Sequence, residues 1–317
     1  MIMLGTARHD GAGKLDAIVY RAGSQKAFYV SEHGTTIARG RDFNSCLDNL
    51  SRLVMEDLDA GLYPPANRDI LHTFITTVDV PLELRDGHRK QPFICRVDET
   101  VDARGRVSFE SQCPTNYLFE SGRSIADAAA RLKDVVAARY EGESIGDLMR
   151  ELPKRPMMTS FAPGKVRPDR WVSATVCRKN GGFEAFSLET PVHAHGSDPF
   201  TALRNLEISL SDIDLSRGPV LKGEPVYCTL DVPLRLKENT ITHRFFTTIS
   251  RYNGSSAPFY AAHIPQCRLS LRSGTFDGAL DAARDAIALE YHEKSAHEVS
   301  EAMKRPVMLT AARVSPN

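Results

Sequence analysis

Apolar residues along this chain follow two periods, a short alternating one typical of strands and a longer one typical of helices. Leu47, Leu50 and Val54 recur at helical spacing, and short runs rich in Val, Ile, Phe and Tyr precede them. The same order of runs returns three more times. Turn signals separate the first two runs, as at Asn180-Gly181, a dipeptide that tolerates the positive φ angles of a tight hairpin. The pattern predicts a unit of three strands and one helix, present four times.

The predicted helices share their first residues as well as their spacing. Each begins at an Asp, Ser or Thr, whose side chain can accept hydrogen bonds from the free amides of the first turn. A small residue follows four positions later. The pairs are Asp42 and Cys46, Ser124 and Ala128, Asp198 and Ala202, and Thr275 and Ala279. We therefore expect an α+β fold in which each helix packs on an antiparallel sheet.

Longer-range repeats indicate a tandem duplication. Lys154-Arg155-Pro156-Met157 returns as Lys304-Arg305-Pro306-Val307, and Asp79-Val80-Pro81-Leu82 returns as Asp231-Val232-Pro233-Leu234. The two offsets are 150 and 152 residues. Self-similarity at a fixed spacing is the signature of repeated structural units. The sequence therefore predicts two halves, 1–164 and 165–317.

Each predicted half contains two units joined by an edge strand. The first half holds units at about 10–64 and 88–164, with the edge strand near 72–86. The second half holds units at about 165–217 and 240–317, with the edge strand near 225–237. Proline cannot donate to a strand ladder, so Pro81 and Pro233 place these segments at sheet edges or strand ends. Short capped helices at Ser144 and Ser295, each followed by a closing strand, complete the two halves.

Composition narrows the class of protein. The 317 residues include 40 basic and 40 acidic side chains, and hydrophobic residues make up 42%. These values are typical of globular proteins and exclude disordered or collagen-like chains. We expect no membrane span, because no apolar run approaches the roughly 18 residues needed, and we expect a cytoplasmic location because Met1–Lys14 lacks a signal pattern. The six cysteines are expected to be free thiols.

The fourth unit resembles a known family. The stretch Tyr260-Ala261-Ala262-His263-Ile264-Pro265-Gln266-Cys267, followed by Gly274-Thr275-Phe276 and an alanine-rich helix, is similar to the HicB-type antitoxin domain. The resemblance implies a partial RNase H-like fold, here in four degenerate copies, with no active site and an inhibitory role. Two positions depart from the family pattern, Gln266 and Gly278, and no DNA-binding tail is apparent.

Candidate chemistry is sparse. His193 and His195 alternate on a predicted strand and could approach one metal ion, but a third ligand would have to come from elsewhere, so we interpret them as surface histidines. Cys267 and His263 could form a nucleophile and base, although a turn is expected to separate them. Asp79 and Asp231 are expected to be solvated or bonded to a turn. We assign no catalytic, cofactor-binding or metal-binding residue.

The repeated basic residues Lys154, Arg155, Lys304 and Arg305 are candidate contacts for an anion or a nucleic acid. Stabilisation of a helix C-terminus is a sufficient structural account of them. We expect a non-enzymatic regulatory or inhibitory protein that acts by binding another protein. The alternatives are a nucleic-acid-binding protein that uses the repeated basic sites, and an enzyme with a site between units. Unpaired sheet edges would also allow a homodimer.

Overall fold

The computed structural model describes residues 7–9, 12–22, 28–33, 36–60, 68–102, 104–113, 116, 118–151, 157–161, 170–179, 181–188, 190–211, 220–221, 225–253, 257–302 and 308–314. The chain divides into two compact units, Met1–Val166 and Arg167–Asn317. The domain boundaries expected from the repeats stay a prediction. None of the helices described is long and apolar enough to cross a membrane.

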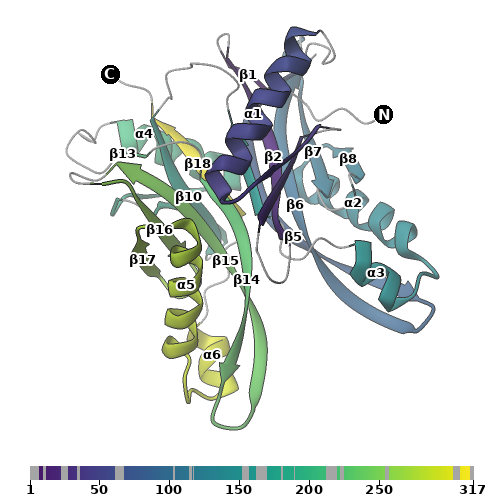
Figure 1. The fold of residues 1–317 in the computed structure, drawn as a ribbon, viewed down its shortest axis with the longest axis vertical. Coiled ribbons are helices and arrows are strands. Elements are labelled where there is room, and N and C mark those ends of the chain that lie inside the picture. The colour runs from purple at the N-terminus through teal and green to yellow at the C-terminus, as the bar shows by residue number, and fades with distance from the viewer. Residues whose placement is uncertain are drawn as a thin grey trace. The chain divides into compact units, whose positions relative to one another are not determined.

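The first unit contains two antiparallel sheets, each followed by a helix (Figure 1). In the first sheet the order is β9-β2-β3-β4, with β1 beside β2, and in the second it is β5-β6-β7-β8. The elements are β1 (Ala7–His9), β2 (Ala12–Ala22), β3 (Phe28–His33), β4 (Thr36–Gly40), α1 (Phe43–Asp59), β5 (Arg68–Leu84), β6 (Gly87–Asp102), β7 (Val107–Cys113), β8 (Leu118–Gly122), α2 (Ile125–Tyr140), α3 (Ile145–Glu151) and β9 (Met157–Phe161).

The second unit repeats this arrangement. Its sheets have the orders β18-β10-β11-β12 and β14-β15-β16-β17, and β13 also pairs with β15. The elements are β10 (Arg170–Lys179), β11 (Gly182–Ser187), β12 (His193–Gly196), α4 (Pro199–Ser211), β13 (Val220–Leu221), β14 (Val226–Arg235), β15 (Thr240–Asn253), β16 (Phe259–Ile264), β17 (Leu269–Ser273), α5 (Phe276–Glu290), α6 (Ala296–Ala302) and β18 (Met308–Val314). The predicted α+β class, with four sheets each followed by a packed helix, is confirmed.

The four predicted helix caps explain where the helices begin. The cap side chains accept from amides in the first turn: Ser45 donates to Asp42 Oδ1 (2.9 Å), Asp127 to Ser124 Oγ (3.1 Å), Thr201 to Asp198 Oδ1 (3.0 Å) and Gly278 to Thr275 Oγ1 (3.1 Å). The amide of each small residue donates to the carbonyl of the same cap residue at 3.0–3.1 Å. The four starts therefore have one geometry.

The strand before each helix ends close to the small residue, and in three copies a glycine ends that strand. A Cβ on Gly40, Gly122 or Gly196 would lie 2.2–2.4 Å from the backbone nitrogen of the small helix residue six positions later, which real side chains do not tolerate. The fourth copy has Ser273 at this strand end, and there Gly278 leaves the room: a Cβ on Gly278 would lie 2.4 Å from Ser273 Oγ. Close approach of strand and helix is thus kept in all four copies.

The strand register also repeats. An aromatic residue lies opposite the strand-ending residue in every copy: Tyr29 opposite Gly40, Phe109 opposite Gly122, Phe183 opposite Gly196, and Tyr260 opposite Ser273. Ring packing repeats as well, since Phe93 stacks on Tyr140 with centroids 5.8 Å apart and Phe245 lies 5.8 Å from Tyr291. These shared registers allow position-by-position comparison of the copies.

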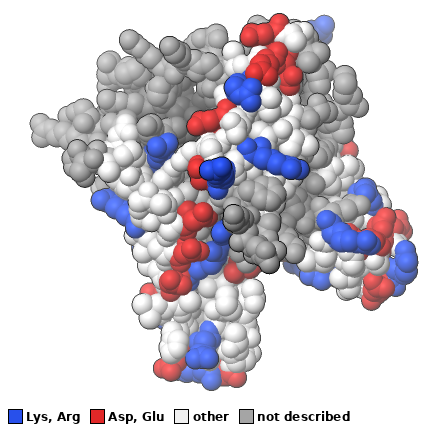
Figure 2. Space-filling model, viewed as in Figure 1, with Lys and Arg blue, Asp and Glu red and all other residues white. Residues whose placement is uncertain are grey.

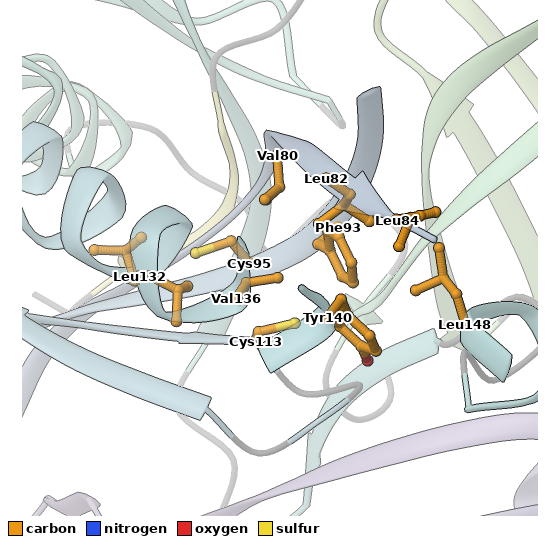
Figure 3. Close-up of a cluster of buried hydrophobic side chains, with 11 residues drawn as sticks. Val80, Leu82, Leu84, Phe93, Cys95, Cys113, Leu132, Val136, Tyr140 and Leu148 are labelled. Atoms are coloured by element: carbon orange, nitrogen blue, oxygen red, sulfur yellow. The ribbon is translucent and has the colours of Figure 1, made fainter. Parts of the chain in front are cut away.

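The core of the second sheet shows how each helix is held. Val80 and Leu82 of β5 and Phe93 and Cys95 of β6 cluster with Leu132, Val136 and Tyr140 of α2, and Leu84 lies beside Leu148 of α3 (Figure 3). Val97 of β6 belongs to the same buried cluster. Most of these side chains are at most 3% exposed. Burial of an apolar side chain of this size contributes about 1.5–3 kcal/mol. The opposite face of the sheet carries the buried side chains of Ile75, Ile94, Arg96 and Asp98.

The segments near 72–86 and 225–237 form strands of two long hairpins. The segment near 72–86 is most of β5, which continues through a turn at Arg85 and Asp86 into β6 and pairs with it from Leu84–Gly87 to Arg68–Asp102. The segment near 225–237 is β14, paired with β15 in the same way. The short helices lie at the hairpin tips, where the Arg85 amide donates to Glu143 O (2.9 Å) and the Lys237 amide to Lys294 O (3.2 Å).

Candidate functional site

The repeated basic pairs cannot be placed. Lys154, Arg155, Lys304 and Arg305 lie outside the described residues. Arg85, His88, Arg89 and Lys90 form a second basic cluster at the tip of the β5–β6 hairpin, and all four are exposed. There His88 pairs with Glu83, and Lys90 Nζ lies 2.9 Å from Asp79 Oδ2. On the face that Figure 2 shows, acidic and basic side chains alternate around this hairpin and α3. Mixed charge of this kind favours no nucleic-acid surface.

The two repeated aspartates are exposed or partly exposed to solvent, as expected, and each is also held in an ion pair. Asp79 pairs with Lys90, as described, and Asp231 accepts two hydrogen bonds from Arg244, at 2.6 and 2.8 Å. Each pair crosses from one strand of the long hairpin to the next. Opposite charges facing each other across antiparallel strands are stabilising. This structural role accounts for both aspartates.

The cysteines are free thiols, and the candidate nucleophile Cys267 is partly buried. Cys46 is fully buried against the end of β4. Burial raises the pKa of Cys267 to about 11 and that of Cys228 to about 12. The Cys267 thiol donates to the Ile264 carbonyl at 3.8 Å. Because only a thiolate is a strong nucleophile, a catalytic pair of Cys267 and His263 is not supported.

A buried charged group on β6 was missed by the sequence reasoning. Arg96 and Asp98 are 4% and 9% exposed, and Arg96 Nε lies 2.8 Å from Asp98 Oδ1. Thr73 Oγ1 donates to the same oxygen at 2.7 Å. On the other face, His72 Nδ1 lies 2.6 Å from Glu99 Oε2. The alternating charges of Arg96-Val97-Asp98 were a usable signal. Buried ions that are paired and hydrogen-bonded satisfy one another, so these residues are structural.

The second unit contains a cavity of about 540 Å³. It is lined by Cys177, Glu184 and Phe186 from one sheet and by His263, Ile264 and Leu269 from the other. Residues 173, 175 and 177 alternate to the face of β10 away from α4. On that face Ser173 Oγ lies 2.9 Å from Ser250 Oγ of β15, so the helix-free faces of the two sheets pack on each other.

Glu184, His193 and His195 gather on the hairpin of β11 and β12. One possible ligand atom of each lies within 4.8 Å of the others. Glu184 and His195 are direct cross-strand partners, with His195 Nε2 3.8 Å from Glu184 Oε1. The structure therefore brings to the predicted histidine pair a carboxylate that the sequence could not assign to it.

His263 lies on the wall of the same cavity. Its side chain comes from β16 and is 6% exposed, and its Nε2 has no hydrogen-bond partner in the structure as described. Burial, with the nearby charge of Arg272 adding to it, lowers the pKa of His263 to about 4. The imidazole is therefore neutral at physiological pH.

Strand β8 forms an end of its sheet and carries an exposed aromatic ring. It pairs with β7 from Cys113–Leu118 to Phe109–Gly122, and it is the last strand of the order in that part of the chain that is described. Phe119, the second residue of β8, lies opposite Gln112 and is 50% exposed. A terminal strand with an exposed apolar side chain is a template for pairing with another chain.

Comparison of this chain with models of protein families, with curated proteins and with solved structures found no match.

Proposed function

We propose that this protein is a non-enzymatic regulator or inhibitor that binds another protein by adding a strand of that partner to the edge of β8. The observation that carries the proposal is the end strand β8 with Phe119 half-exposed. In strand addition, main-chain hydrogen bonds supply affinity, and contacts with alternate side chains supply specificity. The partner segment is therefore extended, with an apolar residue facing Phe119.

Comparison of the copies favours this edge over the others. In the first copy, Asn49 of α1 donates from Nδ2 to the carbonyl of Arg39 in the end strand β4 (2.8 Å). In the third copy, Asn205 of α4 donates in the same way to His195 O of β12 (2.8 Å). These amides occupy a carbonyl of the end strand. The equivalent residue beside β8 is Arg131, which instead binds Asp127 with Nε at 3.0 Å.

The fourth copy lacks this amide too, but it presents a different edge. Its residue at that helix position is Ala282. The end strand there, β17, has Ser270 and Arg272 as its exposed residues, and its two leucines are only partly exposed. An edge with an exposed charge resists pairing with another chain. Among the described end strands, β8 thus combines two features. It carries an exposed aromatic ring, Phe119, and the helix residue beside it is Arg131 in place of an asparagine.

The antitoxin resemblance supports the same kind of function. Three antiparallel strands followed by a packed helix is the arrangement that a HicB-type domain implies, and the fourth copy has this order in β15, β16, β17 and α5. A domain of this type has no catalytic centre and acts by inhibiting a partner. We include the family assignment in the proposal, at the level of a HicB-like scaffold in four degenerate copies.

Capture experiments with matched variants test the proposal. The tagged full chain is used to capture proteins from a lysate of the source organism, in parallel with Phe119→Lys and Ile37→Lys. Ile37 is 56% exposed on β4, the end strand whose carbonyl is bound by Asn49, so its variant changes charge and apolar surface equally. We expect a stoichiometric partner that Ile37→Lys retains and Phe119→Lys loses.

Three results would count against strand addition at β8. They are capture of no partner by the wild-type chain, capture that Phe119→Lys leaves unchanged, and loss of capture with both variants alike. Sedimentation of the purified chain separates a further case. A homodimer that Phe119→Lys converts to monomer would show that the edge binds a second copy of this chain and would overturn the proposal of a different partner.

A further inference from the structure

We propose that Glu184, His193 and His195 bind one divalent metal ion on the wall of the second unit's cavity, and that Zn²⁺ is the ion their chemistry fits best. Two imidazoles and one carboxylate are a known protein ligand set for Zn²⁺ with an open coordination position. The inference is independent of the proposed strand addition, which involves the other unit.

The hairpin register places all three side chains on one face. Glu184 lies directly opposite His195, and His193 lies two residues before His195 on the same strand. Side chains at alternate strand positions share a face, and direct cross-strand neighbours have Cβ atoms about 5 Å apart. The two imidazole rings have centroids 5.8 Å apart at an angle of 81°, so they do not stack. Ligand atoms within 4.8 Å of one another can converge on one ion with small side-chain movements.

The other copies show that the fold does not require these residues. Strand pairing gives the equivalent positions. In the order of Glu184, His193 and His195 they are Val30, Ile37 and Arg39 in the first copy, Glu110, Phe119 and Ser121 in the second, and Ala261, Ser270 and Arg272 in the fourth. Only the third copy combines three metal-binding side chains. Their combination therefore needs an explanation beyond the scaffold.

The surroundings suit an ion that keeps one coordination position open. The Glu184 side chain is 19% exposed, whereas both histidines are exposed, so the ion can enter from solvent. Glu184 and His193 also line the cavity, and this places the open position next to it. His263, on the opposite wall, offers a neutral imidazole whose Nε2 is unpartnered among the described groups. It is a suitable hydrogen-bonding group for a water or small anion bound to the metal.

The test is isothermal titration calorimetry, in which ZnCl₂ is added to the full chain after EDTA has been used to remove bound metal. We expect one ion per chain. His193→Ala, His195→Ala and Glu184→Gln should each weaken binding about tenfold or more, because each removes one of three ligands. Because both histidines are exposed, replacing them with alanine should have little effect on folding. Glutamine has nearly the same shape as Glu184. Cobalt substitution supplies a second readout, since d–d absorption bands report Co²⁺ bound in a site of low coordination number.

Matched controls come from elsewhere in the chain. His292→Ala removes an exposed histidine near Glu293, and Glu110→Gln removes the carboxylate at the equivalent position of the second copy. Both should bind one Zn²⁺ with wild-type affinity. The proposal is overturned if the wild-type chain binds no Zn²⁺ at micromolar concentration. It is equally overturned if the three ligand variants bind as the wild type does, or if the control variants lose as much affinity as they do.

Discussion

At the scale of single residues, the four copies share the close approach between the end of a strand and the start of the following helix. The sequence predicted the small residue four positions after each cap, but it did not predict the glycine that ends the preceding strand. The small residue follows six positions after Gly40, Gly122 or Gly196, and it lies in the helix whereas the glycine ends the strand. The role of these glycines depends on the angle between strand and helix, which local pattern does not specify.

Gly122→Ala should lower the free energy of unfolding by about 1–3 kcal/mol, the usual cost of overpacking. The added Cβ would lie 2.4 Å from the backbone nitrogen of Ala128, so the strand or the helix must move. Urea denaturation measures the change. Gly146→Ala is the control, since its Cβ meets only Ser144 Oγ at 3.6 Å and alanine favours a helix. An equal loss in both variants would contradict the account.

The fourth copy makes a reciprocal prediction. Gly278→Ala should destabilise the protein, because its Cβ would lie 2.4 Å from Ser273 Oγ. Ser273→Gly removes that atom, so the double variant should recover part of the loss, since the Cβ would still lie 2.8 Å from Thr275 Oγ1. A double-mutant cycle in urea gives the coupling, expected within about 0.5–3 kcal/mol for residues in contact. Additive effects of the two changes would show that Ser273 and Gly278 do not share this space.

His263 should make stability depend on pH. Its pKa is lowered to about 4 by burial and Arg272, so the unfolded chain binds the proton more tightly. The stabilisation is complete above the unfolded pKa of about 6.5 and is lost as pH falls toward 4, by up to about 3 kcal/mol. Urea denaturation in EDTA at pH 7.5 and pH 5 measures it. His263→Gln should reduce the difference, whereas His292→Gln should leave it unchanged.

At the scale of elements, local signals predicted the helices and the three-strand sets but not the partners of the long strands. The cap residues fix the helix starts, so all four were found. The hairpin of β5 and β6 does have a local signal, Asp86-Gly87, where Gly87 has φ of 123°. The pairing of β9 with β2 and of β18 with β10 has no local sequence signal, because the paired strands lie far apart in sequence.

The cap geometry gives a prediction for α2. Ser124→Ala should lower the free energy of unfolding by about 1 kcal/mol, because the Asp127 amide loses its acceptor at 3.1 Å. Ser124→Asp should keep most of the stability, since aspartate is also a good cap. Ser121→Ala, an exposed change on β8, is the control and should have little effect. Thermal unfolding followed by circular dichroism measures all three. A Ser124→Ala variant as stable as the control would contradict the assigned cap.

In the candidate metal site too, the features within one strand could be predicted from sequence, whereas those that depend on strand pairing could not. His193 and His195 could be paired from sequence because two residues of one strand share a face. Glu184 could not be assigned to them, since its position opposite His195 depends on how the chain turns between β11 and β12. A change of register by one residue would place Glu184 on the face that α4 covers.

At the scale of the whole molecule, one α+β unit occurs four times within two compact units of the chain. Repetition explains why so long a sequence has so few catalytic signals: most positions serve the scaffold. It also provides an internal reference, since a residue present in one copy only is not required by the scaffold that all four copies share. By this criterion Phe119 at the β8 edge and the Glu184, His193 and His195 group stand out.

Hydrogen exchange of the full chain, alone and with its captured partner, tests the central claim of strand addition most directly. Main-chain pairing at the open edge should slow amide exchange in β8, Leu118–Gly122, with little change in β4, Thr36–Gly40. Phe119→Lys should abolish that protection. Protection confined to segments other than β8, or a complex in which the β8 amides exchange as fast as in the free chain, would contradict the account.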